Sequence, residues 1–296
     1  MTAIPDEQNT EPMLRLLRAS QQTYLRATRL LVVQWFLAVV APALGAALAL
    51  AFTPAQPYVA AAALLIAFFD VAVLDRVQSR KIRLAAKISE AFDCGVLDLP
   101  ANRFVAGGPV DHEVITEAAA AWSGRPLTDW YPPSIGKAPP HLGRIICQRT
   151  NFWYDATLRR HYGVQVLSLA ALVVIALLIA AIAAGQSVET MVVAVLAPVA
   201  PMLIWSVREY LRQQDTADEQ EASKADVEAL WTTARAGACG EADCLTQSRE
   251  FQDALYMRRA TSPLMLPVVY SVRRPKMEKL MNKGAEELLK EIGIEP

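Results

Sequence analysis

Four long apolar blocks interrupt an otherwise charged sequence, and they determine the predicted architecture. They span residues 30–52, 58–74, 162–188 and 190–207, and Asp70 is the one charged residue inside them. A membrane helix needs about 20 apolar residues to cross the hydrocarbon, because its backbone N–H and C=O groups must be satisfied within the segment. The pattern therefore predicts an all-α membrane protein with four transmembrane helices.

The connections between the blocks predict how these helices pair. Residues 53–57 and the residues around 184–189 leave room only for tight turns, so the helices form two hairpins. The charged segments beside the hairpins have helical patterns of their own. The predicted division is a cytosolic N-terminal helix (1–29), a first transmembrane hairpin (30–74), a cytosolic segment (75–161), a second transmembrane hairpin (162–207) and a cytosolic C-terminal helical region (208–296).

The distribution of Lys and Arg predicts the orientation. Four of the 29 precede residue 30, twelve lie between residues 76 and 161, and thirteen follow residue 207, whereas the two hairpin tips have none. Cytoplasmic loops carry the excess of positive charge in membrane proteins. We therefore expect a multi-pass protein with both termini and the central segment in the cytoplasm.

Overall composition narrows the classes of function. The 296 residues carry a formal net charge of −1, which disfavours binding to DNA or RNA polymers through bulk positive charge. The polar N-terminus shows no cleavage site of a removable signal peptide. The four cysteines lie in predicted cytosolic segments, where thiols stay reduced. Cys239 and Cys244 lack a second ligand pair nearby, so we interpret them as ordinary thiols rather than a zinc site.

The sequence contains no recognisable catalytic motif. It has no glycine-rich phosphate loop, no G-x-S-x-G turn and no H-E-x-x-H sequence. Its three histidines, His112, His141 and His161, are far apart and lack the spacing of metal ligands. We therefore expect a protein that is not an enzyme, with no catalytic residues, no cofactor and no metal site.

Four residues inside the blocks are candidates for a role in gating. Pro42, Pro198 and Pro201 each remove a backbone hydrogen bond and can kink a helix, which suits a pore or gate and equally suits simple packing. Asp70 is either part of an ion path or interhelical hydrogen bond, or an interfacial carboxylate; its place near the cytoplasmic end favours the last. Small residues crowd the first two blocks and favour close helix association, hence a homo-oligomer.

The segment RIICQRTNFWYDATLRRHYG, residues 144–163, places charge directly against the third block. Every third or fourth residue in it is polar, which forms one stripe on a helix. Spacing alone favours a solvated helix face. The alternative is that the stripe docks another cytosolic segment or binds an anionic ligand, and then acts as a switch. The candidate residues are Arg144, Gln148, Arg149, Asn151, Trp153, Asp155, Arg159 and Arg160.

Helix and breaker signals predict the C-terminal region. They indicate a charged helix over residues 208–236, a break at 237–240 and a second helix to about residue 259. Three prolines, Pro263, Pro267 and Pro275, predict a non-helical run before a last helix over 276–292.

Several ordered motifs resemble those of a known family. They are IPDEQN with the following LRLLRASQQTYLRA, AKISEAFDCGVLDLP after the second block, LTDWYP, and RIICQRTNFWYDATLRRHYG. Together they resemble the SMODS-associating four-transmembrane effector family over the N-terminal two thirds of the chain. One departure is Tyr154, where the family pattern has a second Trp or a similar residue.

The resemblance implies a pore-forming effector of cyclic-oligonucleotide-based antiphage signalling (CBASS), located in the bacterial inner membrane. It implies activation by a cyclic oligonucleotide from a partner nucleotidyltransferase, followed by membrane disruption and abortive infection. The lipid bilayer and a second copy of the chain are further expected partners. A membrane-anchored scaffold and a small channel or transporter subunit are the alternatives, and both predict no lethal leak.

Overall fold

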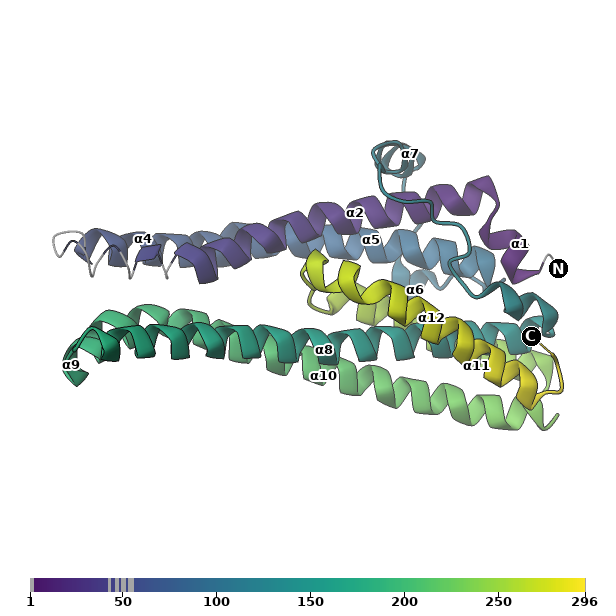
Figure 1. Ribbon diagram of the computed structural model, residues 1–296. Coiled ribbons are helices and arrows are strands. Elements are labelled where there is room, and N and C mark those ends of the chain that lie inside the picture. Colours follow the sequence, from purple (N-terminus) through teal and green to yellow (C-terminus); the bar gives the residue numbers. More distant parts are fainter. Residues whose placement is uncertain (1–2, 42–43, 46–47, 49–51, 53–55, 296) are drawn as a thin grey trace.

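The computed structural model describes residues 3–41, 44–45, 48, 52 and 56–295, and all regular structure in these residues is helical (Figure 1). The predicted all-α class is therefore confirmed. The elements are α1 (Ile4–Gln8), α2 (Glu11–Trp35), η1 (Phe36–Val40), α4 (Gln56–Phe69), η3 (Asp70–Leu74), α5 (Asp75–Val96), α6 (Arg103–Ala106), α7 (His112–Ala120), η4 (Pro133–Lys137), α8 (Pro140–Ala183), α9 (Val188–Met191), η5 (Val192–Leu196), α10 (Ala197–Arg235), α11 (Glu241–Thr261) and α12 (Pro267–Glu291).

The first hairpin pairs α2 with the continuous helix formed by α4, η3 and α5 (Figure 1). The two arms share one polar contact within the predicted spans, because Gln34 Nε2 donates to Asp70 Oδ1 at 2.7 Å. Asp70 thus makes the interhelical hydrogen bond that the sequence left as one alternative. In hydrocarbon such a bond satisfies two groups that would otherwise lack partners.

The second hairpin pairs α8 with α10, and glycines permit both its turn and its close packing. Gly185 has φ of 67°, a left-handed conformation that suits glycine, and Ser187 Oγ then accepts a bond from Thr190 N. At Gly163 a Cβ would lie 3.3 Å from Tyr210 Cδ2, so the missing side chain lets the two helices approach. Ala170, Val199 and Met202 pack together nearer the turn.

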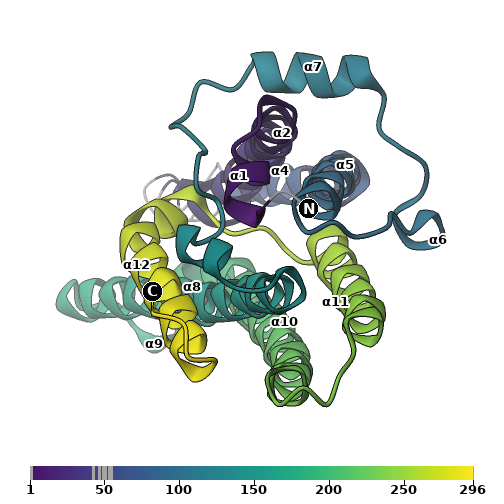
Figure 2. The ribbon, with the colours of Figure 1, turned by 90° about the vertical axis from the view of Figure 1, so that its right-hand side faces the viewer.

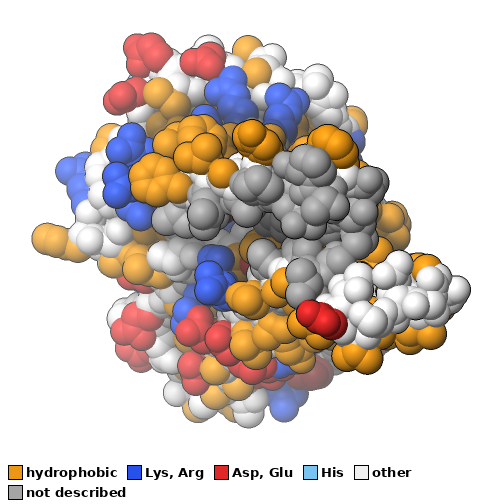
Figure 3. Space-filling model, turned by 90° about the vertical axis from the view of Figure 1, so that its left-hand side faces the viewer, with side chains coloured by type: hydrophobic (Ala, Val, Ile, Leu, Met, Phe, Trp, Pro, Cys, Tyr) orange, Lys and Arg blue, Asp and Glu red, His pale blue; other side chains and the backbone are white. Residues whose placement is uncertain are grey.

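The hairpin ends away from the termini are apolar on their outer surfaces. Tyr58, Leu65 and Phe68 are 70–76% exposed, and Leu172 and Ile182 are 63% and 65% exposed. Figure 3 views the hairpin tips end on, and hydrophobic side chains gather around them. Soluble proteins rarely expose apolar patches of this extent, so this end is built for a lipid environment.

Among the described residues, one helix is both long and apolar enough to cross a membrane. It is α8, with 44 residues and a mean hydropathy of 3.1 over its most apolar 18-residue stretch. The other predicted spans fall into shorter pieces: the first includes residues outside the described ones, the second is the 14-residue α4 followed by η3, and the fourth is α9, η5 and the start of α10. The four-span topology stays a prediction.

One proline candidate, Pro198, follows a π-helical turn. The turn η5 ends at Leu196, two residues before Pro198, and the turn η1 ends at Val40, two residues before Pro42. A proline leaves one carbonyl of the preceding turn without its usual donor, and a wider turn is one way to accommodate that. Pro201 lies within α10. Pro42 itself lies outside the described residues.

The other half of the molecule contains the charged helices and most of the core. Seen from that end, α11 lies beside α5 and α10, and α12 lies on another side of α8 (Figure 2). The predicted break at residues 237–240 is confirmed, because α10 ends at Arg235 and α11 begins at Glu241.

The prediction of a non-helical run up to Pro275 was wrong in its extent. The run ends at Leu266, and α12 begins at Pro267 and continues through Pro275. Proline suits the first helical turn because its nitrogen needs no partner there. The ring at position 275 costs one backbone bond, and the packing of Met277, 4% exposed, and Leu289, fully buried, holds the helix together beyond it.

Candidate functional site

A buried set of polar side chains joins the helices that continue into the two hairpins. Helix α5 follows the second predicted span and α8 runs into the third, and α11 lies between them. We call the contacts that α11 makes with both the α11 bridge. Its members are Glu90 and Asp93 of α5, Gln148 of α8, and Arg249, Gln252 and Arg259 of α11.

Gln252 is the centre of the α11 bridge, and it is fully buried. Its Nε2 donates to Glu90 Oε2 at 2.8 Å and to Asp93 Oδ2 at 2.9 Å. Its Oε1 accepts from Gln148 Nε2 at 3.4 Å. The Nε2 of Gln148 also donates to the carbonyl of Ser248 at 2.7 Å. One amide thus connects a helix of the first hairpin to a helix of the second.

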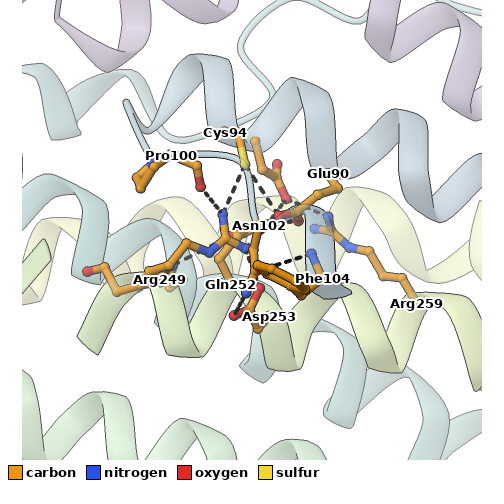
Figure 4. A network of polar contacts seen from close by, with 12 residues as sticks. Glu90, Cys94, Pro100, Asn102, Phe104, Arg249, Gln252, Asp253 and Arg259 are labelled. Carbon is orange, nitrogen blue, oxygen red and sulfur yellow. Dashed lines mark hydrogen bonds and ion pairs between the residues drawn. The ribbon is translucent and has the colours of Figure 1, made fainter. Parts of the chain in front are cut away.

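Two arginines of α11 compensate the two buried carboxylates. Glu90 is 4% exposed and its Oε1 lies 2.6 Å from Arg249 Nη2; Asp93 is 1% exposed and forms an ion pair with Arg259. Arg249 also donates to Asp253 at 2.9 Å, and its Nη1 reaches the Pro100 carbonyl at 2.8 Å (Figure 4). A buried charge without a partner is very costly, so these pairs fix how α11 seats on α5.

The carboxylate of Asp93 also reaches the linker and α8. It accepts from the hydroxyl of Tyr131 at 2.7 Å, and that hydroxyl accepts from Asn151 Nδ2 at 2.9 Å. Tyr131 is 1% exposed and stacks on Phe92 with ring centroids 6.4 Å apart. The proline-rich linker therefore forms a second connection between α5 and α8.

The predicted polar stripe on α8 faces the protein and not the solvent. Arg144 is 3% exposed and Gln148 is fully buried, so the interpretation as a solvated helix face was wrong. Arg144 Nε donates to the carbonyl of Leu97, just after α5, at 2.8 Å. The stripe docks other segments because α11 and the linker cover this face, which residue spacing within α8 cannot reveal.

The end of the stripe nearest the third predicted span connects α8 to α10 and to the segment between α11 and α12. Asp155 and Arg159 are four residues apart on α8 and form an ion pair, with Arg159 Nε 2.6 Å from Asp155 Oδ2. Arg159 Nη1 also donates to Gln213 Oε1 at 2.9 Å and to the carbonyl of Pro263 at 2.8 Å. Asp155 accepts a further bond from Gln220 at 2.5 Å.

The remaining candidates of the stripe region are more exposed. Arg149 pairs with Glu228 of α10 at 2.8 Å and Arg160 pairs with Asp218 at 3.0 Å. Trp153 contacts Tyr154 edge to face, with ring centroids 6.4 Å apart. The candidate arginines thus have protein partners in this conformation, and a ligand at this place must displace them. Ligand binding there stays a prediction.

Burial sets the ionisation of the groups around the bridge. Burial, and then the neighbouring Glu90 carboxylate, raise the pKa of the Cys94 thiol to about 12, so it stays a thiol at neutral pH. Burial opposes the charge of Arg259, but Asp93 and the nearby tyrosines outweigh it and raise its pKa. Burial lowers the pKa of Arg144. The ion pairs of the α11 bridge are therefore held by compensation of charge.

Several polar atoms of the α8–α11 contact lack a hydrogen-bond partner among the described residues. They are buried and lie on neighbouring turns of the two helices: Arg144 Nη1, Gln148 Oε1, Ser248 Oγ and Arg249 Nε. An unsatisfied buried polar group costs about 1–3 kcal/mol.

One cavity is lined by acidic side chains and therefore does not suit an anionic ligand. It has a volume of about 790 Å³, lies between α10 and α11, and carries the carboxyl groups of Asp226, Asp243 and Glu250. The thiols of Cys239 and Cys244 lie nearby, with sulfurs 2.9 Å apart. No group of three or more possible metal ligands occurs in the described part of the chain.

The sequence alone did not identify the α11 bridge. Glu90 and Asp93 belong to the motif AKISEAFDCGVLDLP, which carries part of the family resemblance, but the sequence alone assigned neither residue a role. A usable signal was present, because both acids lie on the buried face of α5 with Ala86 and Ser89. An acid on a buried face needs a partner cation. The partners are about 160 residues away in the chain, beyond the reach of periodicity.

Comparison with known proteins identifies the class of this all-helical membrane protein. The chain belongs to the family described as the SMODS-associating 4TM effector domain, whose model matches residues 2–288. It is similar to a probable CBASS effector molecule of Bacillus cereus (strain VD146), with 20% identity over 211 residues that cover 70% of each chain. No solved structure matches it.

Replacing Arg249 by Ala tests the energetics of the bridge. Glu90 would stay buried without its cation, and breaking a buried pair costs about 3–5 kcal/mol. We expect the free energy of unfolding of the detergent-solubilised protein to fall by several kcal/mol in chemical denaturation. The control is Arg258→Ala on the same helix, whose ion pair with Glu219 is exposed, and which should cost less than about 1 kcal/mol. Equal losses in both variants would contradict the assignment.

A second prediction concerns pH. Glu209 is 5% exposed, and burial raises the pKa of its carboxyl above 4.5, with Gln213 opposing in part. Its protonated form favours the folded state below the unfolded pKa, and that contribution is lost as the pH rises through the folded pKa. Glu209→Gln should therefore raise the thermal midpoint at neutral pH, with the gain shrinking toward pH 4.5. The exposed Glu287→Gln is the control; a gain independent of pH would refute the prediction.

Proposed function

We propose that this chain is a pore-forming effector that a cyclic oligonucleotide switches on and that disrupts the bacterial inner membrane. Membership of the effector family and the similarity to a probable CBASS effector molecule supply the class. We further propose that the chain spans the membrane four times with both termini in the cytoplasm. The protein would act without catalysis, through a change of conformation.

The observation that carries the proposal is the α11 bridge. Helices α5 and α8 are each continuous with a predicted membrane span, and they meet through α11 in the charged half. A signal that moves α11 would therefore change the relation of the two hairpins without any chemical step. The proposed mechanism uses the segments predicted from the sequence. They are the hairpins at 30–74 and 162–207 and the charged segments at 1–29, 75–161 and 208–296.

The proposed resting state is the conformation with the bridge closed. The ligand's binding energy must favour an open arrangement, since a ligand shifts an equilibrium only by its difference in affinity for the two states. Once released, the hairpins of several copies would associate through their small-residue faces, and Asp70 with the prolines Pro42, Pro198 and Pro201 would shape the path.

Substitutions in the stripe test the switch. Asp155→Ala, Arg149→Ala and Arg159→Ala each remove a contact between α8 and α10 through which a movement would pass to the second hairpin. We therefore expect each to abolish toxicity while leaving membrane insertion intact. The measurement is dye influx and loss of membrane potential on induction beside the signalling nucleotidyltransferase, with membrane fractionation. The control is Lys290→Ala, which loses an exposed ion pair with Glu287.

The outcomes separate the proposal from its alternatives. Persisting toxicity in all three stripe variants would show that the stripe is not the switch. No leak in the unmodified protein under activating conditions would favour a membrane-anchored scaffold. Flux of a solute without cell death would favour a channel or transporter subunit.

A further inference from the structure

The first half of α12 presents an apolar strip that no described residue covers. Val268 is 71% exposed and Val272 is 75% exposed, and four residues apart on a helix they share one face. Along the same face Lys276 and Lys279 follow, and both are exposed. The strip is therefore apolar at its beginning and cationic one turn later.

The chain's own contacts fix the level of this strip on the molecule. Arg159 donates to the carbonyl of Pro263, and Gln213 Nε2 lies 3.2 Å from the carbonyl of Leu264. These donors lie just outside the predicted cytoplasmic ends of the third and fourth spans. Figure 1 accordingly shows α12 beginning beside the middle of α8 and running toward the end that holds the termini. With the spans as predicted from the sequence, the valines are at the level of the cytoplasmic membrane surface, and the lysines are farther from it.

The opposite face of α12 is held against the protein, so the strip cannot turn inward. Tyr270, Arg274 and Glu278 of α12 contact one another on this face, with the Arg274 guanidinium 5.2 Å from the ring centre of Tyr270 and its Nε 2.6 Å from Glu278. Glu278 and Met277 then tie the face to the rest of the protein. Glu278 also accepts from Arg125 at 2.8 Å, and Met277 is buried. The orientation of Val268 and Val272 is therefore a property of the fold.

We propose that this strip is a docking surface for the cytoplasmic leaflet, with Val268 and Val272 at the boundary of headgroups and acyl chains, and Lys276 and Lys279 on anionic phosphates. An exposed apolar strip at the membrane end of a helix can enter the boundary, while the lysines that follow extend back to lipid phosphates. The inference rests on the proposed membrane function. It makes the C-terminal region, predicted as a cytosolic tail, a lipid-contacting element.

The test is depth-dependent quenching in reconstituted protein. Val272→Cys and Leu280→Cys are each made with Cys239→Ser, because the other cysteines are buried, and are labelled with an environment-sensitive fluorophore. Leu280 is exposed on the same helix, about 12 Å farther along. The probes are vesicles of phosphatidylethanolamine and phosphatidylglycerol with nitroxide-labelled lipid, and the same vesicles without nitroxide. Flotation shows that each labelled protein is inserted.

The expected result is blue-shifted emission and clear quenching at position 272, and weaker quenching at position 280. Lys276→Glu combined with Lys279→Glu should weaken the quenching at 272 in these vesicles and change it little in phosphatidylcholine alone. Equal quenching at the two positions, or none at 272 in inserted protein, overturns the docking surface. Self-quenching of the 272 label that rises with protein density, without lipid quenching, assigns the strip to a second copy and overturns it too.

Leakage of vesicle contents, measured on the same samples, separates this inference from the proposed function. Quenching at 272 without leakage under activating conditions keeps the docking surface and refutes the pore. Leakage without quenching keeps the pore and refutes the docking surface. Failure of the protein to float with vesicles refutes both.

Discussion

The arrangement of the charged half depends on how two buried carboxylates are compensated. Glu90 and Asp93 project from one face of α5 at 4% and 1% exposure, and a pair of acids there requires cations and donors from another segment. Helix α11 supplies Arg249, Arg259 and the amide of Gln252. Because the same amide accepts from Gln148, the requirement of α5 also places α8.

In the proposed mechanism, this constraint would pass a signal in the charged half to the membrane. At the level of the bridge, the helices α5 and α8 make few direct contacts with each other. Helix α11 and Tyr131 of the linker connect them. The contacts are specific in geometry, because Glu90 and Asp93 each accept from named donors of α11. Such a network favours one arrangement of the helices.

Local patterns predicted much of the fold. The apolar blocks indicated the helices, and the glycine-rich break between α10 and α11 was found at its place, because both depend on near neighbours in the chain. The extent of α12 was missed, since the fixed φ of Pro267 starts a helix as well as it interrupts one. The ion pair of Asp155 with Arg159 was predictable for the same local reason.

The site was predicted only in part. The polar stripe on α8 was correctly placed on one face, but its burial depends on α11, about 100 residues later. Glu90, Asp93, Arg249 and Gln252 were missed because their meaning arises only when distant helices come together. Acids on the apolar face of a predicted helix, and polar residues at helical spacing on another helix, can be found from the sequence. Which acid pairs with which partner cannot.

In the proposed mechanism, leakage requires α11 to separate from the α5 side of the molecule. Asn102 Nδ2 lies 2.8 Å from Asp253 Oδ2, and both side chains are partly accessible. Asn102→Cys with Asp253→Cys can therefore be joined by a short bis(methanethiosulfonate) reagent in purified protein that is reconstituted in vesicles. Each thiol displaces one methanesulfinate to form a disulfide, and a reductant cleaves the link. With a panel of cyclic oligonucleotides, we predict leakage before cross-linking, none after it, and recovery when the link is cleaved. Full leakage from the cross-linked protein would contradict the account.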